Sequence, residues 1–278
     1  MRQNRLSVVI GSGGVLCAAS LGLIKALRRE GLAPGLTVGC SGGSIYAACI
    51  ALGMDPGEAQ ALTLSLFTSD VFEGYTSNLK SALSGETRFT EMSSLIDGNV
   101  MYERLKTVFG DKKFADTVLP LYIVATELYS GERVVLSSGK LLDAIRASIA
   151  IPMIFSPWKV DGQLLVDGAV CDPLPIDVAI QQGSDVIAAV GFEMPTRKRM
   201  NSYTAVTTHF NSIYMNNILK STFAFYNAVH HAEIIPILPE FERPVGTFDT
   251  GQIPYIIERG EKAAEAHIPY IRQLVSNK

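Results

Sequence analysis

The chain has 278 residues, 47% of them hydrophobic and only 18% charged, with a mean hydropathy of +0.22. That length is enough for one large α/β domain with a substantial buried core. The net charge is −3 and no basic run is longer than Arg197-Lys198-Arg199, so the sequence lacks the basic footprint of a nucleic-acid-binding protein. No window reaches the roughly 18 consecutive apolar residues that a membrane-spanning helix needs.

The amino-terminal residues and the cysteines indicate a reducing cellular compartment. After Arg5 the apolar run spans only residues 6–10, shorter than the roughly 7–15 residues of a signal-peptide core, and a strand explains it better. The cysteines Cys17, Cys40, Cys49 and Cys171 form no CxxC pair and lie in apolar or glycine-rich settings. Such settings favour reduced, buried thiols, and no His/Cys cluster has zinc-ligand spacing. We expect a cytoplasmic protein without a metal or another cofactor.

The predicted elements alternate between strands and helices along the chain. Their order is a strand at 6–10, a helix at 15–30, a strand at 36–38, a helix at 44–52, a helix beginning at Pro56, strands at 119–126 and 133–136, a helix at 141–148, strands at 164–166 and 185–190, a long amphipathic helix over 203–229, a strand at 234–238 and a helical region at 253–275. Residues 68–98 have a weak pattern and are predicted as a mobile cover or a surface helical hairpin. The alternation predicts a mainly parallel sheet with helices on both faces, in a single domain over residues 1–278.

The sequence Gly39-Cys40-Ser41-Gly42-Gly43 fits the pattern G-x-S-x-G between a predicted strand and a helix of small residues. This is the context of a nucleophile elbow, where a sharp turn presents a serine at a helix N-terminus. Gly39 and Gly43 let the chain turn without steric clashes. Because the pattern alone occurs by chance in a chain rich in Gly and Ser, the flanking elements carry the prediction that Ser41 is a nucleophile.

A second glycine-rich turn, Gly11-Ser12-Gly13-Gly14, follows the first predicted strand and precedes a helix. Acyl transfer needs N–H donors aimed at the oxyanion of the tetrahedral intermediate, and such a turn beside the elbow can supply them. A dinucleotide-binding fingerprint is excluded because Leu16 stands where its third glycine would be and no acidic residue ends the second strand. No Gly-Lys-Ser/Thr sequence marks a P-loop.

Ser41 needs a base, and the sequence offers two kinds. The order Ser41, Asp167, then His230 or His231 would match an α/β-hydrolase triad, but only about two strands precede Ser41, whereas in that fold the elbow follows several. The alternative is Asp167-Gly168 at the end of a short predicted strand. A carboxylate there can take the Ser41 proton directly, and burial would raise its pKa. Asp-Gly is also a common turn sequence.

Four blocks together resemble the patatin-like phospholipase family. They are the turn at 11–14 leading into Leu21-Gly-Leu-Ile-Lys-Ala-Leu27; the elbow at 39–43; Ser137-Ser-Gly139 with Ala144-Ile-Arg-Ala-Ser-Ile-Ala-Ile-Pro152 and Phe155-Ser-Pro157; and Asp167-Gly-Ala169 continuing into Asp172-Pro-Leu-Pro175. The resemblance implies a three-layer α/β/α sandwich with a mainly parallel central sheet. It further implies a Ser41–Asp167 dyad, an oxyanion hole around Ser12, Gly13 and Gly14, no metal, and hydrolysis of lipid acyl esters of the phospholipase A or lysophospholipase type.

The chain departs from the family pattern beside the oxyanion turn. The turn usually continues with a basic residue and a glycine, whereas this chain has Leu16 and Cys17, and Ser12 stands at the turn's first glycine. Three other functions stay open: a Ser–His–Asp esterase, an acyltransferase on the same site, and a non-catalytic lipid-binding protein. The expected partners are a lipid or fatty-acyl ester and, in a peripheral contact, a membrane surface.

Overall fold

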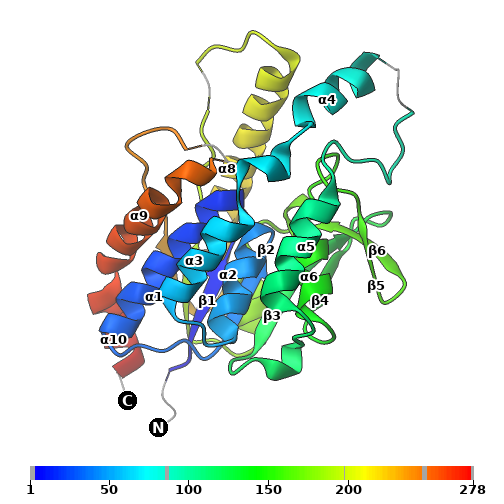
Figure 1. Ribbon diagram of the computed structural model, residues 1–278. Coiled ribbons are helices and arrows are strands. Elements are labelled where there is room, and N and C mark those ends of the chain that lie inside the picture. The colour runs from blue at the N-terminus through cyan, green and yellow to red at the C-terminus, as the bar shows by residue number, and fades with distance from the viewer. Residues whose placement is uncertain (1–3, 85–87, 197, 246–248, 277–278) are drawn as a thin grey trace.

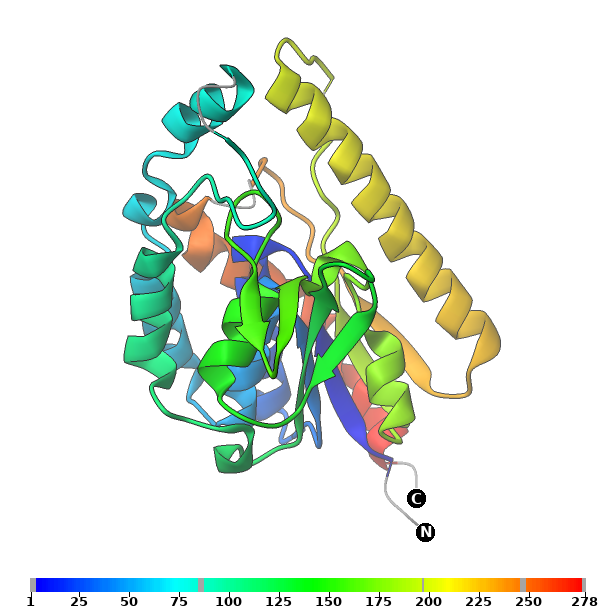
Figure 2. The ribbon, with the colours of Figure 1, turned by 90° about the vertical axis from the view of Figure 1, so that its right-hand side faces the viewer.

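The computed structural model describes residues 4–84, 88–196, 198–245 and 249–276. Within them seven strands of an eight-stranded sheet follow the order β5-β6-β3-β2-β1-β7-β8. The eighth strand, β4, pairs with β3 outside this order. Helices cover both faces of this sheet (Figures 1 and 2). The predicted α/β sandwich with a mainly parallel central sheet is confirmed.

The strands of the central part are parallel and those at one edge are antiparallel. The parallel strands are β1 (Leu6–Ile10), β2 (Thr37–Cys40), β3 (Leu121–Glu127), β7 (Val186–Val190) and β8 (Glu233–Ile237). The strands β4 (Arg133–Leu136) and β6 (Gln163–Asp167) run antiparallel to β3, and β5 (Trp158–Val160) runs antiparallel to β6. The antiparallel edge matters for function because it carries Asp167 to the carboxyl end of the parallel strands.

The helices divide between the two faces. One face carries α1 (Ala19–Arg29), α2 (Gly42–Ala51), α3 (Pro56–Leu66), α5 (Gly98–Phe109), α6 (Leu141–Ser148), α9 (Ile253–Glu265) and α10 (Ile268–Ser276), and the other carries α7 (Ile176–Gln181) and α8 (Tyr203–Val229). Two short 3-10 turns, η1 (Gly14–Ala18) and η4 (Gly168–Val170), lie at the carboxyl end of the sheet. The strand β1 is buried throughout and apolar apart from Ser7, because Val8 faces the first layer and Val9 the second.

Local sequence signals explain several boundaries. The helix α3 begins after Asp55, whose side chain accepts from the Gly57 amide, while Glu58 completes the capping box. The helix α1 ends before Gly31, which has a positive φ of 68° that favours glycine. The bounds predicted for β4 and α6 from the sequence agree with the structure.

The structure corrects other expectations. The helix predicted at 15–30 is divided into η1 and α1, and the region at 253–275 into α9 and α10. The helices α5 and α7 and the strand β5 were not expected, and of these α7 and β5 are short, with six and three residues. The weak region at 68–98 contains α4 (Tyr75–Ser84), and residues 85–87 lie outside the described residues. Cys171 is exposed, whereas all four thiols were expected to be buried.

Two helices extend beyond the sheet at its carboxyl end. Figures 1 and 2 show α4 and the amino-terminal half of α8 rising at the same end of the molecule. The carboxyl-terminal half of α8 packs on the sheet through Leu219 and Phe223, which belong to the core of the second layer. Among the described residues, no helix combines the length and the apolar character that crossing a membrane requires.

Candidate active site

Ser41 forms a tight elbow between β2 and α2. Its φ of 55° and ψ of −132° lie outside the ordinary regions for a residue with a side chain. Such a conformation costs about 1–3 kcal/mol and persists only where the surroundings enforce it. A Cβ on Gly39 would come within 2.6 Å of the Ser44 Cα, so this position admits only glycine where α2 passes over β2. The predicted elbow is therefore present as backbone geometry.

The elbow lies directly against the glycine-rich turn. A Cβ on Gly42 would be 2.5 Å from the Gly14 carbonyl oxygen, and one on Gly43 would be 2.6 Å from that of Gly11. The two turns therefore touch through their backbones. The Ser12 amide donates to the Pro173 carbonyl oxygen at 2.8 Å. Of the three residues expected to form the oxyanion hole, Gly13 and Gly14 remain the ones whose amides we expect to serve as donors.

Asp167 lies at the end of β6 and contacts Ser41. The Ser41 Oγ donates to Asp167 Oδ2 at 2.6 Å, and the Ala169 amide donates to Asp167 Oδ1 at 2.8 Å. The Asp167 backbone is held as well, because its amide donates to the Ala150 carbonyl and its carbonyl accepts from Thr126 Oγ1, both at 2.9 Å. Two residues that are distant in sequence thus form a pair at hydrogen-bond distance.

The glycine after Asp167 is required by the same packing. A Cβ on Gly168 would lie 2.4 Å from the Val124 carbonyl oxygen and 2.9 Å from the Cys40 sulfur. The chain therefore passes directly over the middle of β3 and the end of β2. This explains the Asp-Gly sequence as a close backbone crossing beside the elbow, and not as an exposed turn.

Burial dominates the electrostatics of the pair. Ser41 is 4% exposed and Asp167 is 2% exposed. Burial raises the pKa of Asp167 to about 7, and the hydrogen bonds from Ser41 and Ala169 oppose this shift. Burial also raises the pKa of the Cys17 and Cys40 thiols, and the charge of Asp167 adds to that shift. The carboxyl group is thus a much stronger base than an exposed aspartate.

The residues that replace the family's basic residue and glycine face the core. Leu16 and Cys17 are buried, and the Cys17 thiol donates to the Gly11 carbonyl oxygen at 3.3 Å. At these positions the turn is supported by apolar packing and a weak hydrogen bond in place of a cation.

An ion-pair cluster anchors the segment that follows Asp167. Arg133 on β4 donates to Asp172 at 2.6 Å and to both carboxylate oxygens of Asp177 at 2.6 and 2.7 Å. It therefore ties the antiparallel edge to α7 and to the segment after Asp167. This cluster was not predicted, because Arg133 is 39 and 44 positions away from its two partners in the sequence.

The histidines lie in other parts of the fold. His230 and His231 precede β8, whose start pairs with the start of β7 at the amino end of the sheet, opposite to Ser41. His267 lies between α9 and α10, and α9 ends beside Arg29 at the end of α1. His209 is in the half of α8 that extends beyond the sheet. The position of His230 and His231 argues against the hydrolase-type triad.

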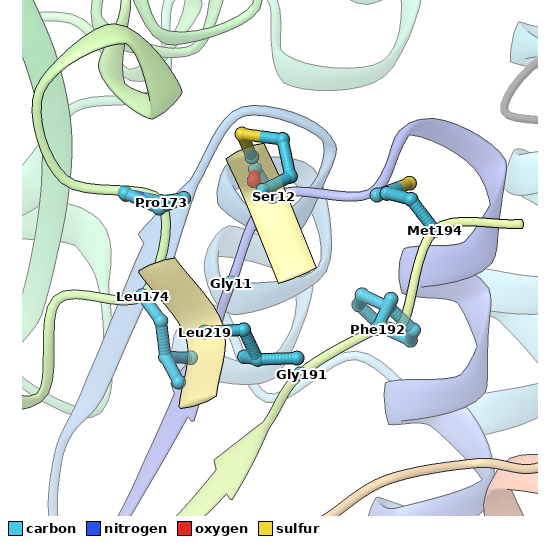
Figure 3. Close-up of a pocket in the computed structure, with 9 residues that line it drawn as sticks. Gly11, Ser12, Pro173, Leu174, Gly191, Phe192, Met194 and Leu219 are labelled. Atoms are coloured by element: carbon cyan, nitrogen blue, oxygen red, sulfur yellow. The ribbon is translucent and has the colours of Figure 1, made fainter. Parts of the chain in front are cut away.

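A small apolar cavity borders the glycine turn. Its lining includes Gly11 and Ser12, and Figure 3 shows this segment between Leu174 and Phe192. Its volume is about 10 Å³, roughly the space of one water molecule. An acyl chain does not fit there in this conformation. Among the described residues, no three His, Cys, Asp or Glu side chains gather in a way that could hold a metal ion.

The profile of the patatin-like phospholipase family matches residues 8–180, a range that includes the glycine turn, the elbow and Asp167. The chain belongs to this family. Curated relatives agree with that membership. An uncharacterized NTE family protein of Mycobacterium tuberculosis is 28% identical over 229 residues, which cover 80% of this chain and 58% of the relative. The mouse patatin-like phospholipase domain-containing protein 7 is 28% identical over 190 residues, covering 67% of this chain and 13% of the relative.

Solved structures share the patatin-like fold. Human GIVD cytosolic phospholipase A2 superposes with a TM-score of 0.58 at 10% identity, covering 98% of this chain and 60% of that one. Its complex with methyl gamma-linolenyl fluorophosphonate gives a TM-score of 0.55 at 12% identity, covering 59% of that chain. The chain thus spans less than two thirds of the length of these proteins and of the mycobacterial relative.

Proposed function

We propose that this protein is a serine acyl hydrolase for lipid esters, in which Ser41 is the nucleophile and Asp167 the base. The observation that carries the proposal is the hydrogen bond of 2.6 Å from Ser41 Oγ to Asp167 Oδ2 within the strained elbow. Membership of the patatin-like phospholipase family supports lipid esters as the substrate class.

The proposed acylation follows from this geometry. Asp167 takes the Ser41 proton while Oγ attacks the acyl carbon, which forms an oxyanion on the former carbonyl oxygen. We assign the amides of Gly13 and Gly14 as the donors to that oxyanion, since the Gly14 carbonyl oxygen lies against Gly42 of the elbow. The intermediate then breaks its bond to the alcohol, and the alcohol leaves with the proton from Asp167. The product is an ester between Ser41 and the acyl group.

Deacylation uses the same groups in reverse. Asp167 takes a proton from a water molecule, and the oxygen of that water attacks the acyl carbon. The oxyanion of this second intermediate accepts from the same amides of Gly13 and Gly14. The bond to Ser41 Oγ breaks, Oγ recovers the proton from Asp167, and the fatty acid leaves. A base whose pKa is raised by burial to about 7 suits both steps, because it accepts a proton more readily than an ordinary carboxylate.

We further propose a peripheral contact with a lipid surface through α8. This helix contains Lys220 as its single Asp, Glu, Lys or Arg residue, and its protruding half exposes Phe210 and Tyr214. Leu83 on α4 is exposed at the same end. An exposed apolar surface of this kind is typical of proteins that bind partners or membranes, and here it lies at the end of the sheet where substrate must arrive.

The test compares wild type with Ser41→Ala and Asp167→Asn on a monomeric p-nitrophenyl ester and on phospholipid vesicles. We expect Ser41→Ala to lose essentially all hydrolysis and Asp167→Asn to lose about 10²–10⁴-fold in rate. Ser20→Ala is the control, because its buried hydroxyl donates to the Cys17 carbonyl oxygen and does not contact the pair. Hydrolysis retained by Ser41→Ala would reject the proposal, and acyl transfer to an added alcohol in preference to water would favour an acyltransferase.

A further inference from the structure

Ser148 is a fully buried serine that the proposed chemistry does not use. It is the last residue of α6 and has no exposed surface. Its hydroxyl accepts from the Ser41 backbone amide at 2.9 Å and donates to the Val124 carbonyl oxygen at 2.7 Å. Because the single hydroxyl proton is directed to Val124, a lone pair of the same oxygen is left to receive the Ser41 N–H.

This contact acts on the strained residue itself. The other polar groups of Ser41 also have partners, since its carbonyl accepts from the Ser44 amide and hydroxyl at 2.9 and 2.6 Å. The Ser41 amide is buried, and a buried N–H without a hydrogen-bond partner destabilises the conformation that contains it. Without the Ser148 hydroxyl, the elbow would gain by rotating away from its positive φ to find another acceptor.

The end of α6 also holds the partner of Ser41. Ala150 follows shortly after Ser148, and its carbonyl accepts from the Asp167 amide at 2.9 Å. Ser148 thus fixes the backbone of the nucleophile, and Ala150 fixes the backbone of the base. Val124 joins both, because it pairs with Cys40 in the sheet and its carbonyl oxygen lies against Gly168. One short segment therefore sets the separation of the two side chains.

We propose that Ser148 is a positioning residue for the reaction, whose hydroxyl holds the Ser41 amide and so keeps Oγ at hydrogen-bond distance from Asp167. This inference rests on the proposed function. It also implies that the Ser41 amide is not an oxyanion donor, which leaves that role to the amides of the glycine turn.

The test uses a matched pair, Ser148→Thr and Ser148→Val. Threonine and valine have the same branched shape, and they differ in that one branch is a hydroxyl in threonine and a methyl group in valine. We expect Ser148→Thr to keep most of the wild-type kcat and Ser148→Val to lose about 100-fold, because a misplacement of about 1 Å at a reacting group has that effect. KM should stay unchanged, because Ser148 is buried beneath the elbow. The rate of fluorophosphonate labelling of Ser41 should fall in parallel with kcat.

Ser148→Ala gives the same comparison without added volume, should the methyl group prevent folding. Ser20→Ala is the control for loss of a buried hydroxyl, and melting temperatures are measured for every variant. A merely structural role predicts a lower Tm with unchanged kcat in the folded protein, and that result would overturn the inference. So would equal labelling rates in Ser148→Thr and Ser148→Val while wild type is labelled at Ser41. Failure to label Ser41 in wild type would reject the proposed function and this inference together.

Discussion

Around Ser41 the backbone of the elbow packs directly against the backbone of the glycine turn, whereas the amino-terminal half of α8 presents large side chains to solvent. Glycines at the elbow leave no room for a Cβ, and the contacts of Ser41 and Asp167 come from β3, β6 and the end of α6. In α8, the residues before Leu219 contribute few buried side chains. A rigid site suits groups that must meet within hydrogen-bond distance, and a loosely packed apolar helix suits contact with a varied surface.

The contact between the two turns gives the largest expected effect. Gly42→Ala places a Cβ 2.5 Å from the Gly14 carbonyl oxygen, so the elbow and the oxyanion turn must move apart. We expect kcat to fall about 100-fold or more. Gly251→Ala is the control, since its Cβ would meet nothing closer than 3.9 Å. Wild-type kcat in a folded Gly42→Ala variant would show that the close approach of the turns is not needed for turnover.

The pH dependence of the wild type tests the electrostatics of the same region. Asp167 accepts a proton only when it is ionised, and burial raises its pKa to about 7. We expect kcat/KM to be constant at high pH and to fall about tenfold per pH unit below about pH 7. The measurement is kcat/KM on a neutral ester between about pH 5 and about pH 9. A profile that stays flat down to the ordinary range of aspartate would contradict a buried basic carboxylate.

Ionisation of Asp167 should lower the stability of the folded protein as the pH rises. Its pKa in the fold, about 7, lies above its ordinary value of about 4, so folding favours the protonated form. The stability associated with this group is therefore complete below about pH 4 and is lost as pH rises through about 7. We expect the Tm advantage of Asp167→Asn over wild type to grow across that range and then level off. Asp161→Asn, at an exposed aspartate, serves as the comparison. A Tm advantage of Asp167→Asn that shrinks with rising pH would contradict a raised pKa of Asp167 in the fold.

The exposed part of α8 gives the smallest expected effect. Phe210→Ser should lower binding to liposomes and the rate on vesicles by a few-fold to about tenfold, because Phe210 is 49% exposed and about half of the roughly 1.5–3 kcal/mol from full burial of such a ring remains to be gained. The rate on a monomeric ester should not change. Phe225→Ser is a matched control on the same helix, with 56% of Phe225 exposed at its other end compared with 49% of Phe210. Equal effects of the two substitutions would contradict a lipid contact confined to the protruding half.

The sequence predicted the parts of the site that depend on local pattern. The elbow follows from G-x-S-x-G between a strand and a helix, and the apolar runs located most strands of the sheet. The pairing of Ser41 with Asp167 has no local pattern from which it would follow, because 126 positions separate the two residues. The family resemblance supplied that pairing, and the structure places the two side chains at hydrogen-bond distance.

The sequence could not predict contacts that exist only after the strands assemble. Ser148 lies within one of the blocks that resemble the family, yet its contact with Ser41 spans 107 positions and has no local signature. The same is true of the Ser12 amide, which donates to the Pro173 carbonyl oxygen. The ion pairs of Arg133 also depend on how β4 lies beside β3. The helix α7 has only six residues, too few to show a period, whereas α5 carries an apolar spacing of four at Met101, Leu105 and Phe109 that could have predicted it.

The most direct test of the central claim is to map the residue that reacts with a fluorophosphonate. Wild type, Asp167→Asn and the histidine variants His209→Ala, His230→Ala, His231→Ala and His267→Ala are labelled under identical conditions, and the adduct is located by peptide mass spectrometry. We predict that the adduct forms on Ser41, that labelling is slowed about 10²–10⁴-fold in Asp167→Asn, and that every histidine variant reacts like wild type. An adduct on another residue, or a single histidine variant that fails to react while Asp167→Asn reacts normally, would contradict the Ser41–Asp167 pair.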